Sequence, residues 1–179
     1  MAKRAVVIID LQNEYLASGK LPLHEVDAAV EKAVQVIEDA RSKGDKVVHI
    51  RHEQPGGPIF VPGSEGAEII SSAAPRSGET VLTKNHPNSF RDTGLKQVLD
   101  EEGVEEVVIV GAMSHMCVAA TARAATDLGY KTVVVQDGCA TMDLEYGGIR
   151  VPAEQVHAAN MAALAFAHGK VVSTAQLVD

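Results

Sequence analysis

The amino-acid sequence predicts a single α/β domain over residues 1–179, a three-layer α/β/α sandwich around a mostly parallel, six-stranded sheet. Six short runs rich in Val and Ile recur along the chain, and segments with helical periodicity lie between most of them. The runs are continuously apolar rather than alternating, as expected for strands buried on both faces of a parallel sheet. Strands that alternate with helices imply right-handed crossovers, which place helices on both faces. A chain of 179 residues is long enough for one sizeable core.

In the N-terminal half, AVVIID and KVVHIR predict strands at residues 5–10 and 46–51. The apolar residues between them follow the 3.6-residue period of a helix: Val30, Ala33, Val34, Ile37 and Ala40. Gly44 supplies the stop signal for this helix. The glycine-rich segment 53–79 is too long for an ordinary connection, so we expect it to form part of a pocket wall. TVLTK then predicts a third strand at 80–84.

In the C-terminal half, strands and helices continue to alternate. The predicted strands are EVVIVGA at 106–112, KTVVVQD at 131–137 and KVVST at 170–174. The predicted helices lie at 90–103, 116–129 and 152–169, the last with a proline near its start and a glycine at its close. Residues 141–151 are expected to form a loop that helps to set specificity.

Composition and charge exclude several classes of partner. The net charge is −8 and no basic run is present, so nucleic acid is not expected as a partner, and a chain without Trp offers little for base stacking. No apolar run approaches the roughly 18 residues that span a bilayer, so no membrane contact is expected. The polar residues after the first apolar run argue against a signal peptide. Two distant cysteines do not form a disulfide framework, and we expect a cytoplasmic protein.

Polar residues follow several predicted strands, in the order Asp10, His52, Lys84, the turn 112–117 and Asp137. In open α/β sheets, ligands bind outside the carboxyl ends of the strands. These residues are therefore candidates for a site. Among them an acid (Asp10), an ammonium (Lys84) and a thiol (Cys117) could act together.

A thiol at its ordinary pKa of about 8.5 is mostly protonated at neutral pH, whereas the thiolate is the attacking form. Cys117 lies where a strand leads into a predicted helix, whose N-terminus presents partial positive charge. A nearby Lys84 ammonium would also favour the thiolate, and Asp10 could accept the proton. The sequence therefore predicts a nucleophilic Cys117 with a lowered pKa, preceded by a turn whose N–H groups could bind an oxyanion.

Each of these residues also has a simpler interpretation. A free cysteine is most often a small packed residue, Asp10 could cap a turn, and a lone lysine such as Lys84 is usually solvated. Three suitable residue types at the ends of three separate strands favour the joint functional interpretation. Cys139, which follows another strand, is expected to be a packed residue.

Three segments of the chain carry motifs. VVIIDLQNEY contains D-x-Q-N after a strand, and GETVLTKNHPNSFRDTGL places a lysine before a phenylalanine and T-x-L. VIVGAMSHMCVAATARAATDLGYKTVVVQDGCAT carries the cysteine. In this order they resemble the isochorismatase-like cysteine hydrolases, the superfamily that includes nicotinamidases and N-carbamoylsarcosine amidase. The likeness extends over nearly the whole chain.

The resemblance implies a role for each matched residue. Asp10 would be the general base, Cys117 the nucleophile, and Lys84 the cation between them. A non-proline cis peptide bond would fall at Ala112–Met113, and the N–H groups of Met113 and Cys117 would form the oxyanion hole. No cofactor is implied.

A metal site is not expected. Nicotinamidases of this superfamily bind a metal through a D-x-H pair after the second strand, whereas this chain reads IRHEQPGGP there, without the aspartate. His49 and His52 would lie on opposite faces of an extended strand, so they do not converge on one ion.

A small molecule is the expected substrate, and relatives suggest a homo-oligomer, either a dimer or a tetramer. The candidate substrate-binding residues are Gln12, Tyr15, His52, His86, Phe90 and His115. Phe60, Met113 and Met142 could add apolar walls, and Arg150 could meet a carboxylate. A structural role in the core or in a loop is an open alternative for each. His157 is expected at the surface or at an interface.

The main functional hypothesis is a hydrolase that cleaves a C–N bond of a small amide, carbamoyl or ureido compound through a thioester. A vinyl ether hydrolase of the isochorismatase type is an alternative, although that chemistry does not use the cysteine. A third hypothesis is a redox sensor or a small-molecule-binding module without catalysis. A dinucleotide-binding module is disfavoured because no G-x-G-x-x-G follows the first strand.

Overall fold

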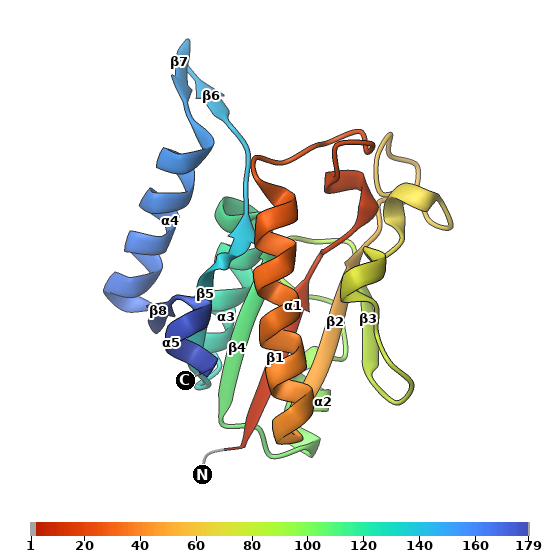
Figure 1. The fold of residues 1–179 in the computed structure, drawn as a ribbon, viewed down its shortest axis with the longest axis vertical. Coiled ribbons are helices and arrows are strands. Elements are labelled where there is room, and N and C mark those ends of the chain that lie inside the picture. The colour runs from red at the N-terminus through yellow and green to blue at the C-terminus, as the bar shows by residue number, and fades with distance from the viewer. Residues whose placement is uncertain (1–2, 179) are drawn as a thin grey trace.

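A fully parallel sheet of six strands forms the centre of the molecule (Figure 1). The computed structural model describes residues 3–178. The six strands are β1 (Arg4–Ile9), β2 (Lys46–His52), β3 (Thr80–Lys84), β4 (Glu106–Ala112), β5 (Lys131–Ala140) and β8 (Lys170–Val172). Their order across the sheet is β3-β2-β1-β4-β5-β8. The predicted six-stranded α/β sheet is therefore confirmed.

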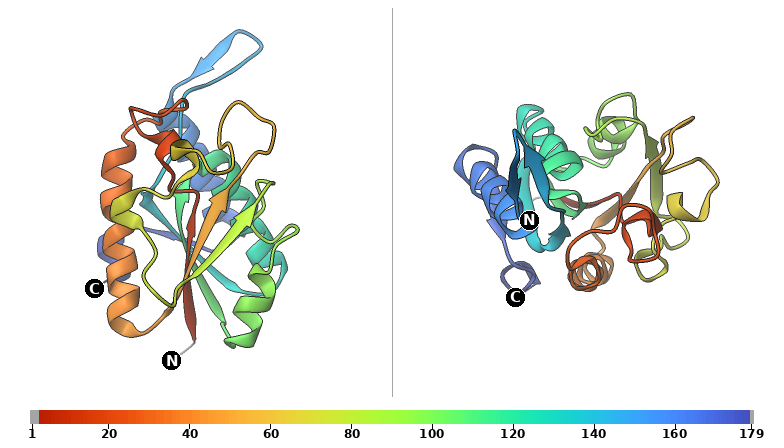
Figure 2. Two further views of the ribbon diagram at one scale, coloured as in Figure 1. Left: turned by 90° about the vertical axis from the view of Figure 1, so that its right-hand side faces the viewer. Right: turned by 90° about the horizontal axis from the view of Figure 1, so that it is seen from above.

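Helices cover both faces of the sheet and complete the predicted three-layer sandwich (Figure 2). The helices of one face are α1 (Val26–Lys43) and α5 (Thr174–Val178). Those of the other face are α2 (Leu95–Glu101), α3 (Ala119–Asp127) and α4 (Ala153–Ala167). None of the helices within residues 3–178 is both long and apolar enough to cross a bilayer.

Alternation along each strand divides the core between the two faces. Val6 and Ile8 of β1 belong to the core beneath α1, whereas Val7 and Ile9 belong to the core beneath α2 and α3. All four side chains are 2% exposed or less. Burial of one such side chain stabilises a fold by about 1.5–3 kcal/mol relative to its exposure. Both faces of the central strands are therefore apolar because helices pack against both of them. Polar side chains that could bind a ligand are expected at the strand ends instead.

The structure confirms the predicted end of one helix and moves the predicted start of another. The helix before Gly44 ends as expected, because Gly44 adopts a left-handed φ of 73° and its N–H bonds the carbonyl of Ala40. The helix predicted from residue 90 begins only at Leu95. Asp92 has a left-handed φ of 55°, and the Thr93 hydroxyl donates to the Ser89 carbonyl, so residues 90–94 form a turn.

The segment predicted as one helix over 116–129 is divided. A π-helical turn, η4 (Ser114–Val118), comes first, and α3 continues from it. The N–H of Val118 donates to the carbonyl of Met113 at 3.2 Å, which closes this wide turn. Cys117 therefore lies in the turn between β4 and α3 rather than in the first turn of a regular helix.

Two segments expected to be loops contain regular structure. Segment 53–79 holds two short 3₁₀ helices, η2 (Glu65–Ala67) and η3 (Ser71–Ala73). Segment 141–151 forms an antiparallel hairpin of β6 (Leu144–Tyr146) and β7 (Ile149–Val151). Figures 1 and 2 show that this hairpin projects beyond the body of the molecule, above α4.

The final apolar run is shorter as a strand than predicted. β8 ends at Val172, because Thr174 begins α5. One oxygen of Asp137 accepts hydrogen bonds from the N–H and the hydroxyl of Thr174, at 2.8 Å and 2.9 Å. Asp137, a candidate at a strand end, thus supports the start of α5.

Candidate active site

The structure brings Asp10, Lys84 and Cys117 together at the carboxyl ends of the strands. The Lys84 Nζ atom lies 2.7 Å from Asp10 Oδ2 and 3.2 Å from Cys117 Sγ. All three residues are buried, and the Lys84 and Asp10 side chains have no exposed surface. The lysine comes from β3, the aspartate follows β1 and the cysteine follows β4, so three elements far apart in the sequence build one cluster.

The backbone holds Asp10 in an unusual conformation. Its φ of 52° is left-handed, a region that costs a non-glycine residue about 1–3 kcal/mol. The Asp10 N–H donates to Ile50 O at 3.0 Å and continues the ladder between β1 and β2. On the other side, a Cβ at Gly111 would lie 1.9 Å from Ile9 O. Only a glycine at position 111 lets β4 approach β1 directly beneath the carboxylate.

His52 makes the third contact of the Lys84 ammonium. His52 and Lys84 are register partners in β2 and β3, and Lys84 Nζ lies 3.0 Å from His52 Nδ1. Burial and the Lys84 charge lower the pKa of His52 to about 4. The ring is therefore neutral at pH 7 and accepts at Nδ1, which puts its own proton on Nε2. Each of the three ammonium protons thus has a buried acceptor.

Replacement of His52 by leucine is expected to leave one Lys84 proton without an acceptor. Burial of an unsatisfied donor costs about 1–3 kcal/mol, so the free energy of unfolding should fall by that amount. His86→Leu is the matched control, because His86 is half-buried and its one ion-pair contact within residues 3–178 is with the exposed Asp92, at 3.4 Å. Urea titration followed by circular dichroism measures both variants. Equal stability of His52→Leu and the wild type would contradict this role.

Cys117 rests as a thiol. Burial and the nearby Asp10 charge raise its pKa to about 12, and the Lys84 ammonium offsets only part of that rise. The prediction of a lowered thiol pKa is therefore wrong. The sequence pattern predicted that Lys84 lies near Cys117, but it did not predict how deeply the thiol is buried. Desolvation opposes the thiolate more strongly than one ammonium favours it.

Asp10 is the proton acceptor within reach of this thiol. Burial raises the pKa of the Asp10 carboxyl, while the Lys84 charge and the hydrogen bonds from Lys84 and Cys117 lower it. Its Oδ2 atom is occupied by Lys84, whereas Oδ1 is buried without a strong hydrogen-bond partner among the described residues. Asp10 Oδ1 can therefore accept a proton.

The same cluster bears on the question of a metal. Asp10, His52 and Cys117 place one potential ligand atom each within 4.8 Å of one another, and no other such group occurs within residues 3–178. However, the Lys84 ammonium contacts all three of them. These side chains therefore surround the Lys84 ammonium, and a metal ion bound by them would have to displace it.

Two side-chain contacts hold the turn that carries Cys117. Ser114 Oγ lies 2.8 Å from His157 Nδ1 of α4 and 3.3 Å from Ala140 O. His115 Nδ1 lies 2.6 Å from Thr141 Oγ1. Burial lowers the pKa values of both histidines, so both rings are neutral at pH 7. His157 is thus half-buried and links α4 to the turn that carries Cys117, a role that its position in the sequence did not indicate.

The peptide bond that enters this turn, Ala112–Met113, is cis in the structure. The carbonyl of Met113 accepts from the N–H groups of Met116 and Val118, at 3.0 Å and 3.2 Å. Its own N–H has no backbone acceptor within the described part of the chain. This donor is therefore available to an incoming group.

Tyr15 and Phe60 line the cluster on one side. Their ring centroids are 5.1 Å apart, and Phe60 also meets the edge of His52 at 5.4 Å. Burial raises the pKa of Tyr15, and the charges of Asp10 and Cys117 add to the rise, which places the phenol beside the reactive groups. Tyr15 and His52 thus lie beside the cluster, and their role in binding a substrate stays a prediction. Phe60 belongs to segment 53–79, so this loop places one aromatic ring beside His52 and Tyr15, and its role as a pocket wall stays a prediction.

Other candidates for substrate binding have structural partners instead. Both amide protons of Gln12 are used by the carbonyls of His52 and Ala67, and its oxygen accepts from the His52 N–H, all at 2.8 Å. Gln12 therefore fixes segment 53–79 to the end of β2, and the prediction that it binds substrate is not supported. Phe90 stacks on Tyr130 and packs against the core beneath α2 and α3, which also contains Cys117, so its role in substrate binding stays a prediction.

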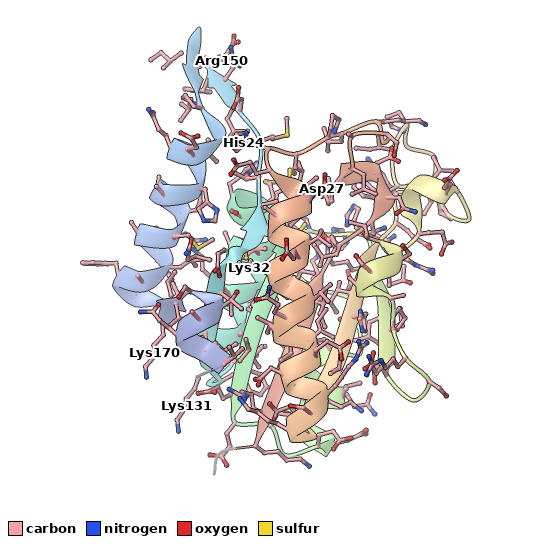
Figure 3. The ribbon with its side chains drawn as sticks, viewed as in Figure 1. His24, Asp27, Lys32, Lys131, Arg150 and Lys170 are labelled. Carbon is pink, nitrogen blue, oxygen red and sulfur yellow. The ribbon has the colours of Figure 1, made fainter. Side chains whose placement is uncertain are left out.

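Two further predictions concern Arg150 and Cys139. Arg150 lies on the projecting hairpin, where it pairs with Asp143, so its predicted approach to a bound carboxylate is not supported (Figure 3). Cys139 is buried and unpaired, and its thiol donates to Val135 O at 3.3 Å. Burial raises the pKa of Cys139 to about 12. It is the packed residue that was expected.

Comparison with known proteins places these features in context. The Isochorismatase domain matches residues 4–176. The chain is 43% identical over 172 residues to the isochorismatase family protein YddQ of Bacillus subtilis, covering 95% of this chain and 96% of the relative. It is 35% identical over 152 residues to maleamate amidohydrolase of Pseudomonas putida, covering 75% of this chain and 71% of the relative. The crystal structure of an isochorismatase hydrolase from Oleispira antarctica matches with a TM-score of 0.95 at 49% identity. The match covers 99% of this chain and 96% of that chain.

Proposed function

The chain belongs to the isochorismatase family, and we propose that it is a cysteine hydrolase that cleaves a C–N bond of a small amide, carbamoyl or ureido compound. The observation that carries the proposal is the Lys84 ammonium in contact with both the Asp10 carboxylate and the Cys117 thiol, at 2.7 Å and 3.2 Å. These groups supply a proton acceptor, a counter-ion and a nucleophile. One relative is named an amidohydrolase, which is consistent with this reaction class.

The first half of the reaction forms the thioester. Asp10 takes the proton of Cys117 as the sulfur attacks the substrate carbonyl carbon, and a C–S bond forms while the carbonyl π electrons move to oxygen. The N–H groups of Met113 and Cys117 stabilise that oxyanion, a contribution of about 3 kcal/mol per donor in comparable sites. The C–N bond then breaks, and the leaving nitrogen takes the proton from Asp10.

The second half returns the enzyme to its resting state. Asp10, again ionised, takes a proton from water as the water oxygen attacks the thioester carbonyl. The C–S bond breaks, the proton passes from Asp10 to the sulfur, and the carboxylic or carbamic acid leaves. Lys84 stays charged throughout and offsets the negative charge that moves among the carboxylate, the sulfur and the oxyanion.

The acidic limb of the pH profile should reflect Asp10. Because the base must be ionised and burial raises its pKa, kcat/KM should fall as pH decreases through a value above the ordinary 3.9 or so of an aspartate. His52, with a pKa of about 4, stays neutral over the same range and does not add a second limb above it. Initial rates between pH 4 and 9 measure the limb. Full activity maintained down to the ordinary aspartate pKa would contradict Asp10 as the base.

The reaction class is tested by a panel of small primary amides, carbamates and ureas, with ammonia release as the readout. Purified protein should release ammonia from at least one class, and Cys117→Ala should release none. A vinyl ether substrate belongs in the same panel. Turnover of that substrate alone, unaffected by Cys117→Ala, would replace the C–N hydrolase by the vinyl ether hydrolase.

A further inference from the structure

A cavity of about 410 Å³ lies between α1, α4 and the last residues of β5. It is separate from the catalytic cluster, because Asp10, Lys84 and Cys117 do not line it. Its floor is β5, and its walls are the N-terminal parts of α1 and α4, which lie on either side of that strand (Figure 1). Cavities that hold small ligands ordinarily have volumes of about 300–1,000 Å³. This cavity is therefore large enough for a ligand of its own.

The early end of β8 leaves room for the cavity. Within residues 3–178, the neighbours of β5 in the sheet are β4 and β8. β8 pairs with β5 only as far as Val135, whereas β5 continues to Ala140. The outer edge of residues 136–140 therefore has no strand beside it among the described residues, and the cavity lies along this edge.

A bulge in β5 directs polar side chains into the same cavity. A step of two residues on β4, from position 109 to 111, corresponds to a step of five on β5, from position 134 to 139. The intervening residues of β5 thus bulge out of the ladder, and two of them, Gln136 and Asp137, line the cavity. Bulges redirect side chains and are common beside ligand sites.

Both of these side chains keep an unused hydrogen-bond acceptor. Asp137 Oδ1 accepts from the N–H and the hydroxyl of Thr174, at 2.8 Å and 2.9 Å. Asp137 Oδ2 and the Gln136 side-chain amide have no hydrogen-bond partner among residues 3–178, and both residues are half-buried. The cavity therefore offers a carboxylate oxygen and an amide oxygen to a donor.

Carboxylates outnumber the amines around the cavity. Its lining carries one ammonium, that of Lys32, on the side of α1 that faces α4 (Figure 3). Burial lowers the pKa of His157, which lines the α4 side, so this ring adds no positive charge at pH 7. The lining carries four carboxylates, those of Glu25, Glu31, Asp137 and Glu154. A cleft lined by one sign of charge attracts the opposite charge, so this cavity favours a cation over an anion.

We propose that this cavity is a second ligand site, which binds a primary ammonium group carried on a short apolar chain. An ammonium has three donors and no acceptor, so it can donate to both Asp137 Oδ2 and the Gln136 amide oxygen. Small apolar side chains form much of the remaining wall and would contact the chain of the ligand: Ala28, Ala29, Ala140 and Ala153.

Three probes of equal chain length test the proposal: hexylamine, 1-hexanol and hexanoate. Hexylamine is protonated at pH 7, as a lysine side chain is. Each probe is titrated into ¹⁵N-labelled protein at pH 7, and the amide shifts are followed by NMR. Hexylamine should give saturable shifts centred on residues 136–141, with a Kd of about 1 mM or lower. Hexanol and hexanoate should bind at least about 10-fold more weakly, because neither supplies a positive charge.

Two variants test the charges that carry the proposal. Asp137→Asn keeps an oxygen for Thr174 but loses the charge, so it should weaken hexylamine binding by about 10-fold while circular dichroism stays unchanged. Lys32→Met removes a like charge and should strengthen binding by about 2-fold or more. Asp127→Asn is the matched control, because Asp127 is exposed at the end of α3, which leads to the start of β5 rather than to its end. It should bind hexylamine like the wild type.

The outcome does not depend on the proposed hydrolase activity, since Cys117→Ala should bind hexylamine as the wild type does. Shifts centred on Asp10, Lys84 and His52 instead would overturn the proposal by placing the amine in the candidate active site. The absence of saturable shifts at residues 136–141 up to about 10 mM hexylamine would overturn it as well. Equal affinity for the three probes, or unchanged affinity in Asp137→Asn, would likewise show that the cavity does not recognise an ammonium.

Discussion

Replacement of Cys117 by alanine or serine should reduce kcat/KM by about 10⁴-fold or more, because removal of a nucleophile that acts within a triad removes covalent catalysis altogether. Cys117 is a buried member of the core beneath α2 and α3, but the change removes or replaces a single sulfur atom, so the fold should persist. The measurement is turnover on the best substrate of the amide panel. Intact-protein mass spectrometry adds a second readout, since only the wild type should accumulate an acyl adduct that hydroxylamine removes.

Cys139→Ala is the control for this experiment. Cys139 matches Cys117 in burial, at 7% and 6% exposure, and its pKa is likewise raised to about 12. It makes none of the contacts with Asp10 or Lys84 found within residues 3–178, however, and its thiol donates to Val135 O of its own strand. Cys139→Ala should therefore retain activity. If Cys117→Ala kept full turnover, or if the adduct formed on Cys139, the proposed mechanism would be wrong.

The fold was predictable because each central strand is buried in the same way and therefore shows the same sequence pattern. A strand buried on both faces needs a continuous apolar run, and residues 5–10 and 106–112 showed it plainly. Helix and strand ends were less predictable, because single residues set them. Asp92 turns the chain before α2, and Asp137 fixes the start of α5 from 37 residues away. No local sequence pattern predicts the turn at Asp92 or the contact of Asp137 with α5.

The membership of the candidate site was predictable in part. Lys84 ends β3, while Asp10 and Cys117 follow β1 and β4, all at the same edge of the sheet, and topology alone brings such residues close together. His52 was assigned to the substrate rather than to Lys84, although a polar residue in register with a buried lysine is the signal that would have identified it. Gln12 was misassigned because its partners, His52 and Ala67, depend on the path of a long loop.

The raised pKa of Cys117 changes how the site must work. Helix position and a nearby cation favour a resting thiolate, but burial outweighs both and leaves a thiol. In the proposed reaction the thiolate therefore forms only as Asp10 accepts its proton during attack. Such a site protects a buried thiol from oxidants between turnovers, because the thiolate is the reactive form.

Lys84→Met should be the most destabilising single replacement in the site. It leaves the Asp10 carboxylate buried without its counter-ion, so the carboxyl is protonated in the folded protein but ionised in the unfolded chain at pH 7. That difference costs about 1.4 kcal/mol for each pH unit above the ordinary pKa of about 3.9, or about 4 kcal/mol at pH 7. The free energy of unfolding should therefore fall as pH rises from about 4 to 7. Urea titrations across this range measure the slope.

Two further variants separate the charge from the packing. Asp10→Asn combined with Lys84→Met removes both charges, so it should recover most of the stability that Lys84→Met loses, although neither variant should turn over substrate. Lys96→Met is the control, because Lys96 is exposed and its ion pair with Asp100 contributes about 1 kcal/mol or less. A pH-independent loss in Lys84→Met, with no recovery in the double variant, would show that Lys84 acts through packing alone. In that case the contact between its ammonium and the Asp10 carboxylate, at 2.7 Å, would not be the interaction that organises the site.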